Sequence, residues 1–61
     1  MHDIYVKVEW LCYEPEIIFF ETTDQACAFA QDKSKEQWVN YCKVYVWGFE
    51  QYTYDFGRLC A

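Results

Sequence analysis

The strongest structural signal in the chain is the stretch IYVKVEWLC, residues 4–12. Residues 4, 6, 8, 10 and 12 are all apolar, whereas Lys7 and Glu9 belong to the other alternate set. A period of two, rich in β-branched and aromatic residues, predicts a strand with one face toward a core. The rest of the chain must supply the neighbours of this strand.

The residues that follow predict a hairpin. Pro15 lacks the N–H that a central ladder needs, so we expect a turn around residues 13–16. Residues 16–21 then form a second strand that is apolar on both faces, with no Gly or Asn to fix the turn type.

A helix is expected after this second strand. Thr22 and Gln25 have the spacing of a capping box, and Asp24 lies in the first turn, where the helix dipole favours negative charge. Ala26, Phe29 and Ala30 recur at helical spacing, with Cys27 at the edge of this apolar face. We expect the helix to end near residue 37 or 38.

Alternation returns over residues 41–49, which we assign to a third strand. Its even-numbered residues face the core, its odd-numbered residues face away, and Gly48 marks a bend or bulge. A fourth strand is expected over residues 51–56, and a short tail from about residue 57. The sequence therefore predicts one domain over residues 1–61, of class α+β: a mainly antiparallel four-stranded sheet in the order strand-strand-helix-strand-strand, with one helix packed on one face.

Composition and charge narrow the function. The 61 residues include three Trp, six Tyr and five Phe, more rings than so small a core can cover. The net charge of −5 opposes direct binding of nucleic acid, although Lys7 and Lys43 lie among the rings. An acidic chain is better suited to a basic protein surface, and the same charge also keeps a small domain soluble.

No catalytic, cofactor or metal motif is recognisable, so we expect no enzyme and no cofactor. His2 is close to the N-terminus, Ser34 has no histidine near it in sequence, and two glycines cannot form a phosphate-binding loop. The cysteines lack the close pairs of zinc sites and are expected to be reduced, metal-free thiols; they are Cys12, Cys27, Cys42 and Cys60.

The apolar runs, such as residues 17–20, are far shorter than the ~20 residues of a membrane-spanning helix. The first residues also lack the basic and apolar regions of a secretory signal. We therefore expect a cytoplasmic protein, in the host cytoplasm if the protein is viral, with no membrane partner.

An exposed aromatic face is the functional signal that remains. If the valines pack beneath the helix, the rings of the first and third strands project from the opposite face, as interaction surfaces often do. The alternative is a strongly curled sheet that buries these rings itself. The candidate protein-binding residues are the aromatic Tyr5, Tyr45, Trp47 and Phe49 and the acidic Glu9, Glu14 and Glu16.

The expected function is that of a small acidic protein-binding module, whose partner is another protein, itself, or both. In length and acidity alone the chain resembles the short proteins of bacteriophages that bind and disable host proteins, which implies a viral inhibitor as one form of this function. Two alternatives are a structural or accessory subunit that acts by homo-oligomerisation, and a cysteine-based, metal-stabilised domain.

Overall fold

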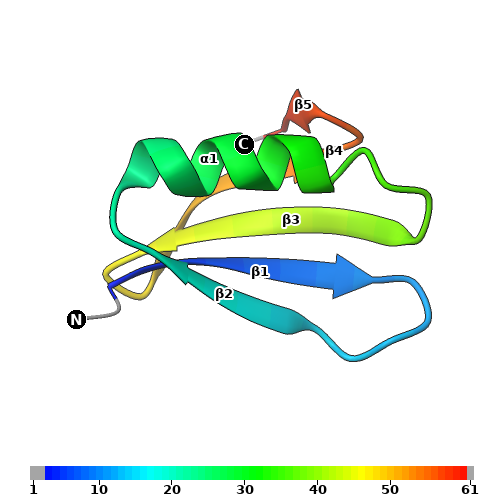
Figure 1. The fold of residues 1–61 in the computed structure, drawn as a ribbon, viewed down its shortest axis with the longest axis horizontal. Coiled ribbons are helices and arrows are strands. Elements are labelled where there is room, and N and C mark those ends of the chain that lie inside the picture. Colours follow the sequence, from blue (N-terminus) through cyan, green and yellow to red (C-terminus); the bar gives the residue numbers. More distant parts are fainter. Residues whose placement is uncertain (1–2, 61) are drawn as a thin grey trace.

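The computed structural model describes residues 3–60, which form one antiparallel sheet and one helix (Figure 1). The elements in chain order are β1 (Ile4–Trp10), β2 (Glu16–Phe20), α1 (Thr23–Lys33), β3 (Val39–Val46), β4 (Phe49–Asp55) and β5 (Arg58–Leu59). The strand order in the sheet is β2-β1-β3-β4-β5, and every neighbouring pair is antiparallel. The α+β class, the antiparallel sheet and the single helix are thus confirmed.

The number of strands differs from the prediction. The sheet has five strands instead of four, because the residues expected to form a tail include β5, which pairs with β4. Phe56 and Gly57 form a two-residue turn between these strands, with φ angles of 54° and 81°. The sequence pattern assigned Phe56 to a strand because its ring continues the alternation of Tyr52 and Tyr54.

The core lies between the helix and one face of the sheet. Val6, Val8 and Val44 are fully buried, and Ala26 and Ala30 of α1 lie against them without exposed surface. The small alanine side chains let the helix approach the sheet closely. The apolar faces predicted for β1 and for the helix are therefore the faces that pack.

Local signals set where the helix begins and ends. The Thr22 hydroxyl accepts a hydrogen bond from the Gln25 amide at 3.2 Å, as the predicted cap requires. The helix ends at Lys33 with Ser34 as its C-cap, four or five residues earlier than predicted. Residues 34–38, between α1 and β3, form turns. Beyond the end of β1, the Leu11 amide donates to the carbonyl of Trp38 at 2.9 Å.

The predicted third strand is interrupted. β3 ends at Val46, and Trp47 and Gly48 form a turn to β4, which begins at Phe49. Both turn residues have positive φ, 55° and 83°, as a type I′ hairpin turn requires. Within this hairpin, Val44 pairs with Tyr52 and Tyr45 with Glu50, so one residue of β4 bulges out of the ladder.

Candidate protein-binding surface

The sheet face away from α1 carries Tyr5 and Tyr45, two of the aromatic residues that the sequence predicted there. Tyr5 and Tyr45 are direct cross-strand neighbours, and their rings stack with centroids 4.9 Å apart and planes 10° apart. Phe19 of β2 packs edge-on against Tyr5, with centroids 5.7 Å apart. The rings half-cover one another, but Phe19 still has 49% of its surface exposed. Mutual packing therefore fixes these rings in place without removing them from solvent.

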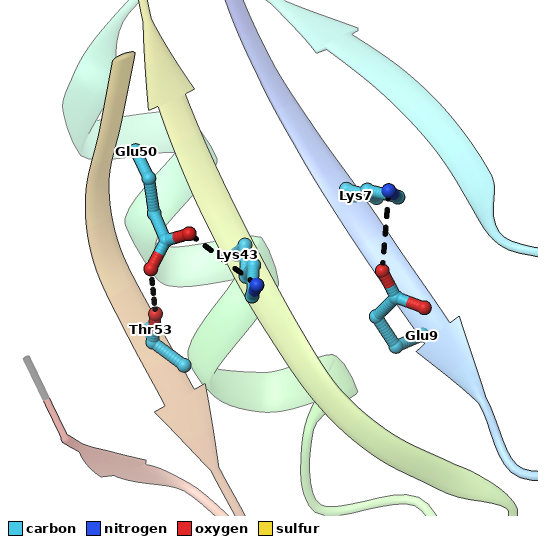
Figure 2. A network of polar contacts seen from close by, with 5 residues as sticks. All are labelled: Lys7, Glu9, Lys43, Glu50 and Thr53. Atoms are coloured by element: carbon cyan, nitrogen blue, oxygen red, sulfur yellow. Dashed lines mark hydrogen bonds and ion pairs between the residues drawn. The ribbon is translucent and has the colours of Figure 1, made fainter.

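Polar contacts border this aromatic row (Figure 2). The Lys43 ammonium lies 3.3 Å from a Glu50 carboxylate oxygen, and the other oxygen of Glu50 accepts a 2.9 Å hydrogen bond from Thr53. The Thr53 bond and then the Lys43 bond lower the pKa of Glu50, and the bond to Glu50 raises the pKa of Lys43. Both groups are therefore charged at neutral pH, and their neighbours restrict their orientation.

Trp47 and Phe49 are more exposed than the stacked tyrosines, with 69% and 70% of their surfaces accessible. The Trp47 amide donates to the Asp3 carbonyl at 2.8 Å, which holds the turn against the start of β1. The assignment of Phe49 to the open face is wrong. Phe49 pairs with Val46, which packs against the core, so Phe49 starts β4 on the helix side of the sheet.

The acidic candidates do not form one rim. Glu9 lies on the internal strand β1 and is paired with Lys7 at 3.4 Å (Figure 2). Glu14 and Glu16 are exposed, but Glu16 pairs with Val8, at the opposite end of β1 from the Trp47 turn. Within one chain, therefore, Glu14 and Glu16 do not border the aromatic end of the sheet.

The sequence reasoning missed two exposed groups. Ile17 and Phe19 lie on the open face of the edge strand, opposite Lys7 and Tyr5. Phe56 is 74% exposed and occupies the same position in its turn as Trp47 does in the other. An aromatic residue followed by glycine precedes a strand at both places, and this repeated dipeptide was the available signal.

The cysteines are dispersed. Cys42 is buried, and burial raises the pKa of its thiol to about 11. Cys12 and Cys60 are exposed, and Cys27 is half-buried. Within residues 3–60, no group of three or more His, Cys, Asp or Glu side chains is arranged to hold a metal ion. His2, expected to be a solvent-exposed terminal residue, lies outside the described residues.

The helix of the described chain is neither long nor apolar enough to cross a membrane. Comparison of the chain with protein-family models, characterised proteins and solved structures finds no significant match in any of the three.

Proposed function

We propose that this protein is a protein-binding module that docks through an aromatic surface at the Trp47 end of its sheet. This surface consists of Tyr5 and Tyr45, which are cross-strand neighbours on the open face, and of Trp47 in the adjoining turn; Phe49 borders that turn from the helix side of the sheet. The exposed ring of Trp47 on a left-handed backbone is the observation that carries the proposal.

The backbone of Trp47 is in a costly conformation. The left-handed backbone conformation costs a residue with a Cβ roughly 1–2 kcal/mol. Type I′ turns therefore favour Asn, Asp or Gly at this position. A tryptophan with 69% of its surface exposed recovers little of that cost by packing within the chain. Residues held in sparsely populated backbone conformations cluster at binding and catalytic sites. The ring is therefore well placed to contribute its stabilisation in a complex.

The neighbours of Trp47 distinguish it from Phe56. Tyr45 and Phe49 flank the Trp47 turn, and the stacked Tyr5 continues the aromatic surface onto β1. Phe56 instead lies between Asp55 and the Gly57-Arg58 pair. Because aromatic anchors act in clusters within desolvated interfaces, the Trp47 end is the better candidate.

The charge of the chain favours a basic partner. Ten acidic and five basic residues give a net charge of −5, which accelerates encounter with a positively charged surface. Glu50 lies opposite Tyr45 and holds a carboxylate beside the aromatic surface. Blocking the basic site of a host protein, as an inhibitor from a virus would, is one use of such a module.

The test compares Trp47→Asn with the matched control Phe56→Asn in affinity capture from a cell lysate, followed by titration of the captured protein. Both substitutions replace an exposed ring in a type I′ turn with a residue that the turn favours. We expect Trp47→Asn to weaken binding by about 2 kcal/mol or more, roughly 30-fold, and Phe56→Asn to leave it unchanged.

We expect both variants to stay folded, because relief of the backbone strain offsets the small loss of packing. Circular dichroism measures whether they do. Val44→Asp serves as the unfolding reference, since it buries an unpaired charge in the core. Equal binding by the wild type and Trp47→Asn would refute the proposal, as would equal losses in both Asn variants.

A further inference from the structure

We propose that the end of the sheet opposite the Trp47 turn binds an arginine-bearing segment of another protein. This end is formed by the loop between β1 and β2 and by the turns that lead from α1 into β3 (Figure 1). It shares no residue with the surface proposed at the Trp47 turn. The residues of this second surface, called the Tyr13 end below, are Trp10, Leu11, Tyr13, Glu14, Glu16 and Trp38.

Exposed apolar side chains gather at the Tyr13 end. Tyr13 has 72% of its surface exposed, and Leu11 and Trp38 each have 56%. The main chains of Leu11 and Trp38 are neighbours, because the Leu11 amide donates to the Trp38 carbonyl. Tyr13 packs against Trp10 with ring centroids 6.2 Å apart and planes at 84°, an edge-to-face contact that covers at most one face of the Tyr13 ring. The ring is therefore restrained and still open to a partner.

Glu14 and Glu16 give this end a negative charge that the described chain does not neutralise. Both residues are exposed, and the ion pairs among residues 3–60 all involve other side chains. Three of the five basic side chains are paired with other glutamates. Of the remaining two, Arg58 lies in β5 at the far edge of the sheet, and the Lys35 side chain lies against Gly57 in the turn before β5. A positively charged partner is therefore the complementary one.

The ring of Tyr13 and the two carboxylates lie together. Glu16 pairs with Val8, whose side chain is in the core beneath α1, and Trp10 packs against the same core. Because cross-strand partners point to one face, Glu16 lies on the helix side of the sheet with Trp10. Tyr13 contacts Trp10, and Glu14 follows Tyr13 directly in the loop.

A cation of the chain already uses this chemistry beside the Tyr13 end. The Lys33 ammonium lies 4.8 Å from the centroid of the Trp10 ring and 3.0 Å from a Glu36 carboxylate oxygen. Tyr13 and Glu14 offer the same pair of groups, and among residues 3–60 no cation lies over the Tyr13 ring. Arginine fits best, because its planar guanidinium stacks on a ring while its N–H groups donate to carboxylates.

Titration of the intact, isotope-labelled chain with a short peptide, followed by amide NMR, tests the proposal. The probe is a peptide amide of alternating leucine and arginine residues. The control peptide carries citrulline, which has the shape of arginine without its charge. We expect the arginine peptide to shift the signals of residues 11–16 and of the Trp38 indole in a saturable way. The citrulline peptide should bind at least about fivefold more weakly.

Three variants locate the contact. Tyr13→Leu should raise the dissociation constant of the arginine peptide about threefold, because leucine keeps an apolar surface but has no aromatic face. Glu14→Gln combined with Glu16→Gln should raise it about fivefold. The matched control, Glu21→Gln combined with Asp24→Asn, removes two exposed carboxylates at the other end of the sheet and should leave it unchanged. The amide spectrum of each variant also reports whether the chain is folded.

The outcomes distinguish this surface from the one at the Trp47 turn. Trp47→Asn should bind the arginine peptide as the wild type does. Equal binding of the two peptides would overturn the proposal, and so would equal weakening by the two double variants. Shifts that centre on Trp47 and vanish in Trp47→Asn would also overturn it, because the cation would then bind at the other end. If the peptide fails to bind while capture from lysate still depends on Trp47, the Tyr13 end is refuted and the function proposed for the Trp47 end is not.

Discussion

Ser34→Ala tests how the helix is fastened to the last hairpin. Ser34 is the only buried polar side chain of the described residues, with 1% of its surface exposed. Its hydroxyl donates to the Gln31 carbonyl at 2.8 Å and accepts from the Gly57 amide at 2.9 Å. The Gln31 side chain adds a more exposed bond to the Gly57 carbonyl at 3.1 Å. Together these bonds hold the β4–β5 turn against the end of α1.

The expected cost follows from what the substitution leaves behind. Alanine removes the acceptor of the Gly57 amide in a part-buried position, and an unsatisfied donor of this kind costs about 1–3 kcal/mol. The lost bond to the Gln31 carbonyl contributes less, because a carbonyl at the helix end can bond to water. We therefore expect the free energy of unfolding to fall by about 2 kcal/mol, which lowers Tm by about 10 °C in a chain of this size.

Urea unfolding gives the free energy, and hydrogen exchange of the Gly57 amide gives the local effect. The control is Gln31→Ala, which removes the exposed bond alone and should cost about 0.5 kcal/mol. The reasoning fails if Ser34→Ala costs no more than Gln31→Ala, or if the Gly57 amide exchanges equally slowly in both variants.

Two further predictions concern the turn glycines and the buried thiol. Gly48→Ala and Gly57→Ala should each cost about 1 kcal/mol for the positive φ, since no atom lies within 4 Å of a Cβ at Gly48 and the atoms near a Cβ at Gly57 belong to the exposed Lys35 side chain, which can move aside; no loss of stability in urea unfolding of either variant would contradict this. A thiol reagent at pH ~8 should label exposed Cys12 rapidly, and Cys42 only at the rate of unfolding. The free energy of unfolding should fall as the pH rises from about 9 to about 11, because the Cys42 thiol ionises in the unfolded chain while it keeps its proton in the native one. Fast labelling of Cys42 in the native state would contradict the second prediction.

The parts of the fold that the sequence predicted are those determined locally. The alternation of β1 and the Thr22 cap each depend on residues within a few positions, and both appear in the structure as expected. The position of Tyr5 beside Tyr45 on one face was also expected, because side chains on one face of neighbouring strands meet; the stacked geometry of the two rings comes from the structure.

The errors arise where a turn lacks its usual residues. Type I′ turns are normally recognised by Asn-Gly or Asp-Gly, and here Trp47-Gly48 and Phe56-Gly57 take their place. Aromatic residues favour strands, so Trp47 and Phe56 extended the predicted strands through both turns. The first error placed Phe49 on the wrong face, and the second led us to expect a tail where β5 lies. Ser34 was missed for another reason: its partner Gly57 lies 23 residues away, and no local pattern indicates that contact.

The predicted acidic rim is incomplete because Glu16 lies at the far end of the sheet from the Trp47 turn. The end of β2 at Phe20 and the Trp47 turn lie at the same end of the sheet, because Ile4 pairs with both Phe20 and Val46. Glu16 pairs with Val8 near the other end of β1, and its side chain lies with that of Val8 on the helix side of the sheet. Glu50 is instead the carboxylate beside the aromatic rings, because it lies opposite Tyr45 on the open face of the sheet. The strand pairing therefore decides which carboxylate can border the aromatic surface, and the sequence pattern, which does not determine that pairing, indicated Glu14 and Glu16 instead of Glu50.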